Sequence, residues 1–268
     1  MSVIRTDKWL EEYFEQPVKI CEKLEANFNG QDAVDIYRIL VKFGMYKPTK
    51  GTKGIYEVLK KKDTWERVEK IYQNYKRKWG GPNIPIYIFP IYQSNGLFFR
   101  DEKLKGGVSF PDKLFLFLSD RVENQDLEAL FVHEYHHVCR LNKQDKRFED
   151  YTLLDSIIIE GLAEYAVLVN CGRKYLANWC TMYSESDIKY LMEKYLKDNL
   201  KKKKMEREHD ELLYGVGGIP NMLGYSAGYK IVENYYQTNS YSTKLSFAIP
   251  SIEYLEKSNI FLYENPDK

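Results

Sequence analysis

Three of the four histidines in this 268-residue chain lie within five positions, in the stretch "LFVHEYHHVC" (130–139). His133 and His137 are four residues apart, and Glu134 directly follows the first of them. On a helix, residues at this spacing share a face with Cβ atoms about 5–6 Å apart, so the two imidazoles could bind one metal ion. Glu134 could accept a proton from a water at the metal without being a ligand itself. The stretch therefore has the HExxH pattern, which combines two metal ligands with a general base.

The alternative for this stretch is a core helix with hydrogen-bonded histidines. Burying each of these polar groups without a partner costs about 1–3 kcal/mol, and a metal would satisfy them together. His136 could compete as a ligand, but the position of Glu134 favours His137. We therefore expect His136 to support a ligand or to contact substrate.

A third ligand is expected in "DYTLLDSIIIEGLAEYAVLVN" (150–170), because a catalytic zinc takes three protein ligands. Thr152 and Asp155 have capping-box spacing, which predicts that a helix begins there. The segment is apolar nearly all round, with Glu160 in its middle. A buried carboxylate needs a cation or strong donors, and none lies nearby in sequence, so zinc is the simplest compensation.

Glu164 lies one turn beyond Glu160, where it could accept the free ring N–H of His133 or His137 and fix its tautomer. Gly161 and Ala163 are small enough to let this helix approach the histidine helix closely. The alternative for the two glutamates is a polar stripe on a half-exposed helix.

The hydrophobic pattern of the sequence predicts the helices and strands that could position these residues. Residues 6–79 have a helical period, interrupted by "KPTKGTKG" (47–54), and helices resume at about Asn124. Residues 84–92 and 113–120 are rich in β-branched and aromatic residues and predict strands. The stretch "LKGGVSFPD" between them predicts a further short strand that ends in a turn at Pro111 and Asp112. The expected fold class is α+β, mainly helical, with a small mixed β-sheet and a helical layer at residues 1–80 that packs on the core formed by residues 81–268.

The segment 185–213 begins with an amphipathic helical pattern, which is followed by a run of four lysines at 201–204. We interpret it as a solvated helix rather than a nucleic-acid contact. His209, a lone histidine in this charged segment, is expected at the surface without a role.

Composition excludes several classes of function. The 40 Lys and Arg against 39 Asp and Glu leave a formal charge of +1, so no global field recruits nucleic acid or an anionic membrane. The start "MSVIRTDKWLEEYFEQ" lacks a signal peptide, and no apolar run is long enough to span a bilayer. We expect a cytoplasmic protein whose function lies in a local site.

"HEYHH", followed after a loop by "IIEGLAEY", resembles the glutamate-type zincins. Their second motif is NEGxAxY in the aminopeptidase branch and ExxxD in the thermolysin branch. Here Ile159 replaces the asparagine of the first form and Glu164 the aspartate of the second. The stretches "GGPNIPIYIFP", "HEYHH", "LLDSIIIEGLAEY" and "LGYSAGYKIV", within residues 80–235, together resemble a bacterial domain-of-unknown-function family of predicted zinc-dependent proteases. The metzincin extension is absent, because Arg140 and Lys143 replace its glycine and third histidine.

This resemblance implies that residues 81–268 form a zincin-like metallopeptidase domain. It implies one Zn²⁺ per chain, with His133, His137 and Glu160 as ligands and Glu134 as general base. The expected reaction is hydrolysis of a peptide bond in a peptide or protein substrate.

Hydrolysis also needs a donor for the oxyanion of the tetrahedral intermediate, and similar enzymes use a Tyr or His. Tyr225 and Tyr229 lie one turn apart in "GVGGIPNMLGYSAGYKIVENYY". We favour Tyr225 as the donor and leave Tyr229 as the alternative.

Zincins usually present an edge strand on which the substrate lies. In "GGVSF", Gly107, Val108 and Ser109 are the candidate substrate contacts. The strand lacks the glutamate with which the aminopeptidase branch holds a free N-terminus, so an endopeptidase is expected.

The alternative function is a non-catalytic zinc-organised binding module whose N-terminal helices recognise a protein partner. Glu134 favours the enzyme, because a structural zinc site has no use for a base and normally closes with a fourth ligand.

Overall fold

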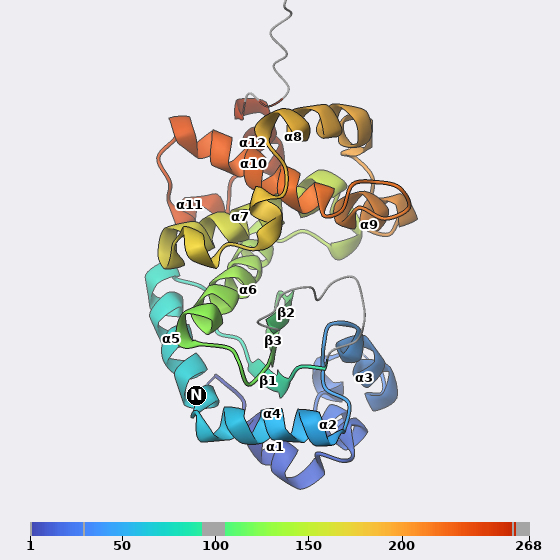
Figure 1. Cartoon of the computed structure of the whole chain (residues 1–268), viewed down its shortest axis with the longest axis vertical. Helices are drawn as coiled ribbons and strands as arrows, with labels where there is room; N and C mark the ends of the chain where they lie inside the picture. Colours follow the sequence, from blue (N-terminus) through green and yellow to red (C-terminus); the bar gives the residue numbers. More distant parts are fainter. Residues whose placement is uncertain (1, 29, 93–104, 259, 261–268) are drawn as a thin grey trace, which may run out of the picture. The chain divides into compact units, whose positions relative to one another are not determined.

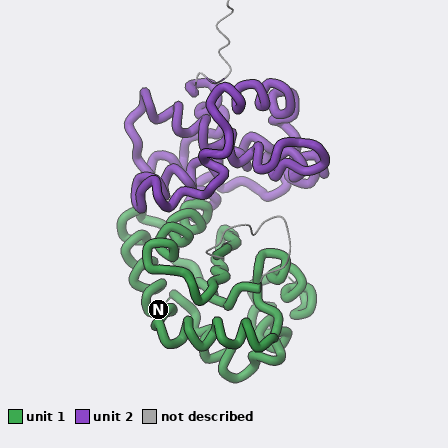
Figure 2. Tube along the Cα trace, in the orientation of Figure 1, with its two compact units in different colours: residues 1–138 green, residues 139–268 purple. Residues whose placement is uncertain are grey.

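The computed structural model describes residues 2–28, 30–92, 105–258 and 260. The chain forms two compact units, residues 1–138 and 139–268 (Figure 2). The limit between the units falls inside helix α6 (Asn124–Gln144), so the unit boundary differs from the expected limit between a helical region and a metallopeptidase domain after residue 80. That domain limit stays a prediction. The two units are described one after the other.

The first eighty residues of the first unit are helical, as the sequence predicted. Helix α4 begins inside the predicted break, because Thr49 and Thr52 form a capping box at its start. Helix α5 ends at Gly80, which has the left-handed conformation that favours glycine. The helices are α1 (Thr6–Tyr13), α2 (Pro17–Glu22), α3 (Ala33–Lys42), α4 (Lys50–Lys61) and α5 (Thr64–Trp79), with a 3₁₀ turn η1 (Glu25–Asn27).

A three-stranded mixed sheet completes the first unit. Strand β3 (Lys113–Leu118) is central, parallel to β1 (Ile86–Pro90) and antiparallel to β2 (Lys105–Phe110). Residues 111 and 112 form the predicted turn between β2 and β3. β3 is buried throughout, whereas β2 is half-buried and, among the described residues, pairs with β3 alone. The expected α+β fold with a small mixed sheet is confirmed, and β2 is an edge strand.

Aromatic side chains fix helix α6 against α5 within the first unit. The course of the two helices can be followed in Figure 1. Tyr135 stacks on Trp79 at 5.9 Å between ring centroids and meets the edge of Tyr72 at 5.5 Å. The Tyr135 hydroxyl donates a hydrogen bond to the Pro82 carbonyl at 2.9 Å. Because this packing involves the residue between the two histidine positions, it fixes the rotation of α6 about its axis.

The second unit is built around α7 and α10, which meet backbone to backbone. A Cβ atom on Gly161 would lie 2.2 Å from the Gly228 carbonyl oxygen, and one on Gly228 would lie 2.0 Å from the Ile157 oxygen. The prediction that Gly161 admits the histidine helix was therefore wrong, since the backbone next to it belongs to α10. The helices are α7 (Leu153–Cys171), α8 (Glu185–Leu191), α9 (Arg207–Tyr214), α10 (Leu223–Thr238), α11 (Thr243–Ser246) and α12 (Ser251–Lys257).

The lysine run is not helical, contrary to the prediction for 185–213. The backbone of residues 200–203 pairs with the start of α7: Leu153 and Leu154 donate their N–H groups to the carbonyls of Lys202 and Leu200, at 2.8 and 3.0 Å. This connection satisfies donors that every helix start leaves without an intrahelical partner.

His209 is fully buried, so its predicted surface position was wrong. Its ring lies between the Ser156 hydroxyl on α7, at 2.9 Å, and the Asp210 carboxylate, at 2.8 Å. His209 therefore joins α9 to α7. In the part of the chain that the structure describes, no helix is both long and apolar enough to cross a lipid bilayer.

Candidate metal centre

The histidine pair of α6 has the geometry of a metal-binding site. The Nε2 atoms of His133 and His137 are 3.0 Å apart, and their rings are nearly perpendicular. Two nitrogens at about 2.0–2.1 Å from a tetrahedral zinc ion would be separated by a similar distance. The aromatic packing of the intervening Tyr135, on the opposite side of α6, fixes the rotation of the helix.

Glu134 is buried and contacts strand β2. The Ser109 hydroxyl lies 2.5 Å from Glu134 Oε2. A Cβ atom on Gly107 would lie 2.6 Å from Glu134 Oε1 and equally close to two side-chain carbons. Two of the three predicted substrate contacts therefore lie against the predicted base.

His136 is fully buried, and its ring meets Trp79 edge-on at 6.0 Å between centroids. This position favours a supporting role over contact with a substrate. Its predicted support of a metal ligand stays a prediction.

In the second unit, Glu160 on α7 lies beside two tyrosines. Burial and the neighbouring Glu160 carboxylate raise the pKa of Tyr225 well above its usual value, and hydrogen bonds with Tyr214 and Glu160 act in the same direction. Burial and Glu160 also raise the pKa of Tyr214 to about 12. The Tyr225 ring stacks on Tyr214 at 5.7 Å and meets Trp179 edge-on at 5.2 Å. Glu160 thus has a phenolic donor, Tyr225, and a second tyrosine nearby, neither of which the sequence indicated as its neighbour.

The sequence interpretation missed Tyr214. It is the last residue of α9, eleven positions before Tyr225, and this chain contains 23 tyrosines. No spacing rule singles it out, because only the packing of α9 and α10 brings the two rings together.

Glu164 is buried and accepts the N–H of Ala177 at 3.0 Å, with the Cys180 thiol 3.7 Å from the same oxygen. Its carboxylate therefore fixes the connection that follows α7. Its predicted hydrogen bond to a histidine ring stays a prediction.

Tyr229 differs from Tyr225 in its partner. Its ring is buried, and its hydroxyl donates to Glu233 Oε1 at 3.2 Å. Burial, and then the Glu233 carboxylate, raise the pKa of Tyr229. Of the two candidate donors, Tyr225 is the one next to Glu160.

His133, His137 and Glu160 form a group that could hold a metal ion, since each offers one ligand atom and these atoms lie within 4.8 Å of one another. Two imidazole nitrogens and one carboxylate oxygen are a donor set found at catalytic zinc sites, where a fourth position is left for water. The donor chemistry of these residues therefore fits zinc.

Comparisons with known proteins agree with this chemistry. A family model described as "Predicted Zn-dependent protease (DUF2268)" matches residues 64–256. The chain is 40% identical over 215 residues to "Uncharacterized protein YjaZ" of Bacillus subtilis (strain 168). The matched stretch covers 80% of this chain and 82% of that protein. No solved structure shows a significant match. The extent of the family match and the identity to YjaZ show that this chain belongs to the DUF2268 family of predicted zinc-dependent proteases.

Proposed function

We propose that this protein is a zinc metallopeptidase of the glutamate-zincin type, with His133, His137 and Glu160 as the metal ligands. The observation that carries the proposal is the group of two histidines and one glutamate, with Glu134 directly after the first histidine. When bound, the zinc ion would polarise the scissile carbonyl and make water a stronger nucleophile.

Glu134 would act as the general base. Its carboxylate accepts a proton from the attacking water and passes it to the amine of the departing peptide. Because Glu134 is next to a ligand in sequence but is not needed as one, its carboxylate can carry out both transfers. A site built only for structure would have no use for it.

Tyr225 would donate to the oxyanion of the tetrahedral intermediate. Its hydroxyl lies beside Glu160, and its high pKa keeps it protonated and able to donate. The contacts with Tyr214 and Trp179 hold the ring in one orientation. Tyr229 is less suited, because its hydroxyl contacts Glu233, whereas that of Tyr225 lies beside the proposed ligand Glu160.

Strand β2 would bind the extended substrate through the backbone of Gly107, Val108 and Ser109. It is half-buried, and its second edge has no strand partner among the described residues. An edge strand offers main-chain groups for the addition of a peptide strand. Binding a segment through its backbone suits an internal stretch of chain, which supports an endopeptidase.

The decisive experiment compares Glu134→Gln with the wild-type protein, both loaded with zinc. Glutamine has nearly the same size but cannot accept the proton, so we expect unchanged zinc content and a loss of turnover of roughly 10²–10⁴-fold. A library of quenched peptides measures the turnover. Glu128→Gln, on the same helix, is the matched control and should retain activity. Equal turnover by Glu134→Gln would eliminate the proposed base.

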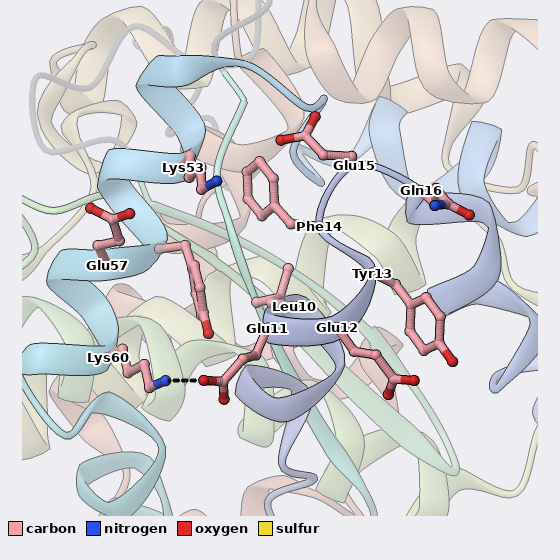
Figure 3. A pocket seen from close by; sticks show the side chains of 11 residues that line it. Leu10, Glu11, Glu12, Tyr13, Phe14, Glu15, Gln16, Lys53, Glu57 and Lys60 are labelled. Atoms are coloured by element: carbon pink, nitrogen blue, oxygen red, sulfur yellow. Dashed lines mark hydrogen bonds and ion pairs between the residues drawn. The ribbon is translucent and has the colours of Figure 1, made fainter.

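One observation favours the second candidate, a non-catalytic zinc-organised binding module. Helices α1 and α4 line a surface pocket of roughly 420 Å³ in the first unit (Figure 3). Its charged lining is net acidic, because Glu12, Glu15 and Glu57 outnumber Lys53, while Glu11 pairs with Lys60 at 3.0 Å. Such a surface could receive a basic segment of a partner protein. Zinc binding without peptide turnover by the wild-type protein would support this candidate over the peptidase.

A further inference from the structure

The hydroxyl of Ser109 lies against two oxygens of Glu134. It is 2.5 Å from Oε2 of the carboxylate and 2.9 Å from the main-chain carbonyl oxygen. Carbonyls inside a helix already accept a helical N–H, and hydroxyl–carboxylate bonds are normally about 2.5–2.7 Å long. The carboxylate is therefore the principal acceptor of the Ser109 proton.

Gly107 lies on the same face of β2, because residues two apart in a strand point to the same side. A Cβ atom at this position would lie 2.6 Å from Cγ, Cδ and Oε1 of Glu134. The strand thus presents one side chain that holds the carboxylate and one position that leaves room for it.

We propose that β2 positions the general base, with Ser109 as the residue that fixes the Glu134 carboxylate. This inference rests on the proposed function, in which Glu134 accepts the proton of the attacking water. With Oε2 held by Ser109, Oε1 is the oxygen that takes that proton. A glutamate side chain has three rotatable bonds, and catalysis needs it within hydrogen-bond reach of the water.

The same strand would then perform two tasks. Its outer edge binds the substrate backbone, and the side that faces α6 holds the base. A shift of β2 would displace the substrate and the Glu134 carboxylate together. The position of the base relative to the substrate therefore depends on this one strand. Ser109 would contact substrate through its backbone and the base through its side-chain hydroxyl.

The test uses zinc-loaded full-length wild type, Ser109→Ala and Ser109→Thr. Ser109→Ala should retain zinc but lower kcat by roughly 10- to 100-fold with KM nearly unchanged. The reason is that a hydrogen bond to a charged group contributes more than one between two neutral groups. Ser109→Thr keeps the hydroxyl and should restore kcat. Crystal structures of the three proteins should show one Glu134 side-chain position in wild type and Ser109→Thr, and a displaced or divided one in Ser109→Ala.

A second variant, Gly107→Ala, tests the same role by displacing the Glu134 side chain. Gly107 has no left-handed backbone conformation, so Gly107→Ala is compatible with the strand but pushes the flexible Glu134 side chain away. It should retain zinc and lose kcat. Ser119→Ala, which removes another buried hydroxyl of the first unit, is the control and should keep wild-type kcat.

The outcomes separate the two proposals. An unchanged Glu134 position in Ser109→Ala and Gly107→Ala would overturn the positioning role, as would an equal loss of kcat in Ser119→Ala. If the wild-type protein cleaves no peptide, the proposed peptidase fails. The Glu134 positions in the crystal structures would then still decide whether Ser109 fixes this carboxylate.

Discussion

Helix α6, which carries the two histidines, is held by aromatic side chains, whereas helix α7, which carries Glu160, is held by a backbone contact. Tyr135 packs on Tyr72 and Trp79 in the first unit, and Gly161 lies against Gly228 in the second. Side chains can adjust to a small change, but two helix backbones in contact cannot. The two regions should therefore respond differently to substitution.

The polar groups of the two regions also differ. In the first unit the Ser109 hydroxyl contacts the carboxylate of Glu134. In the second, Tyr214 and Tyr225 lie beside Glu160 in a partly buried aromatic cluster. A carboxylate with a phenolic donor can be accommodated without a metal, whereas two imidazole nitrogens 3.0 Å apart call for a shared cation or proton. Metal removal should thus affect the histidine pair more directly than Glu160.

The largest expected effect tests whether both regions hold one metal. Wild-type protein should bind about one zinc per chain, and His137→Ala or Glu160→Ala should lose most of it together with all turnover. Metal analysis after dialysis measures the stoichiometry. Full occupancy in Glu160→Ala would show that Glu160 is not a ligand, and His136 or Glu164 would become the alternatives.

His209→Ala is the control for the zinc measurement. This histidine is buried but bonds Ser156 and Asp210, so its removal should lower stability and leave zinc stoichiometry unchanged. A loss of zinc from folded His209→Ala would contradict the assigned ligand set.

The second-largest expected effect tests whether Tyr225 or Tyr229 donates to the oxyanion. Tyr225→Phe should lower kcat by roughly 10²–10³-fold with KM nearly unchanged, because only stabilisation of the transition state is lost. Tyr229→Phe should cost far less, since its hydroxyl contacts Glu233 and not the proposed ligand Glu160. Steady-state kinetics of the two variants gives an internal comparison. If Tyr229→Phe is the damaging change, the donor lies one turn further along α10.

The smallest expected effect concerns the backbone contact. Gly161→Ala should lower the free energy of unfolding by about 1–3 kcal/mol or more, because its Cβ atom would overlap the α10 backbone. Gly54→Ala in α4 has no atom within 4 Å of the added Cβ and should stabilise by about 0.5–1 kcal/mol. Thermal or urea unfolding checks both variants. Equal stability of the two would show that α7 and α10 can separate without cost.

Local sequence patterns predicted the local features of this protein. The Thr152–Asp155 capping box and the turn between β2 and β3 are confirmed. Each depends on residues a few positions apart, whose contacts follow from the geometry of one helix start or one hairpin. The helical spacing of His133 and His137 is likewise a local property, and the observed Nε2 separation follows from it.

Long-range packing could not be predicted in the same way. The sequence did not indicate that His209 is buried, that Gly161 faces α10, or that the lysine run continues as extended chain beside α7. A lone histidine among charged residues is not part of any hydrophobic pattern that would show that it is buried. A glycine in a helix shows that close approach is possible but does not specify which helix approaches.

The sequence by itself determined the chemistry of this protein: two histidines at helical spacing, a carboxylate beside them, and a second apolar helix with a glutamate at its centre. Tertiary structure alone decided which groups contact those residues. Ser109 lies 25 positions from Glu134, and Tyr214 lies 54 positions from Glu160, so no local periodicity relates them. Only the folding of β2 against α6 and the packing of α9 and α10 around α7 bring them together, because such contacts depend on the burial of whole elements rather than on spacing within one.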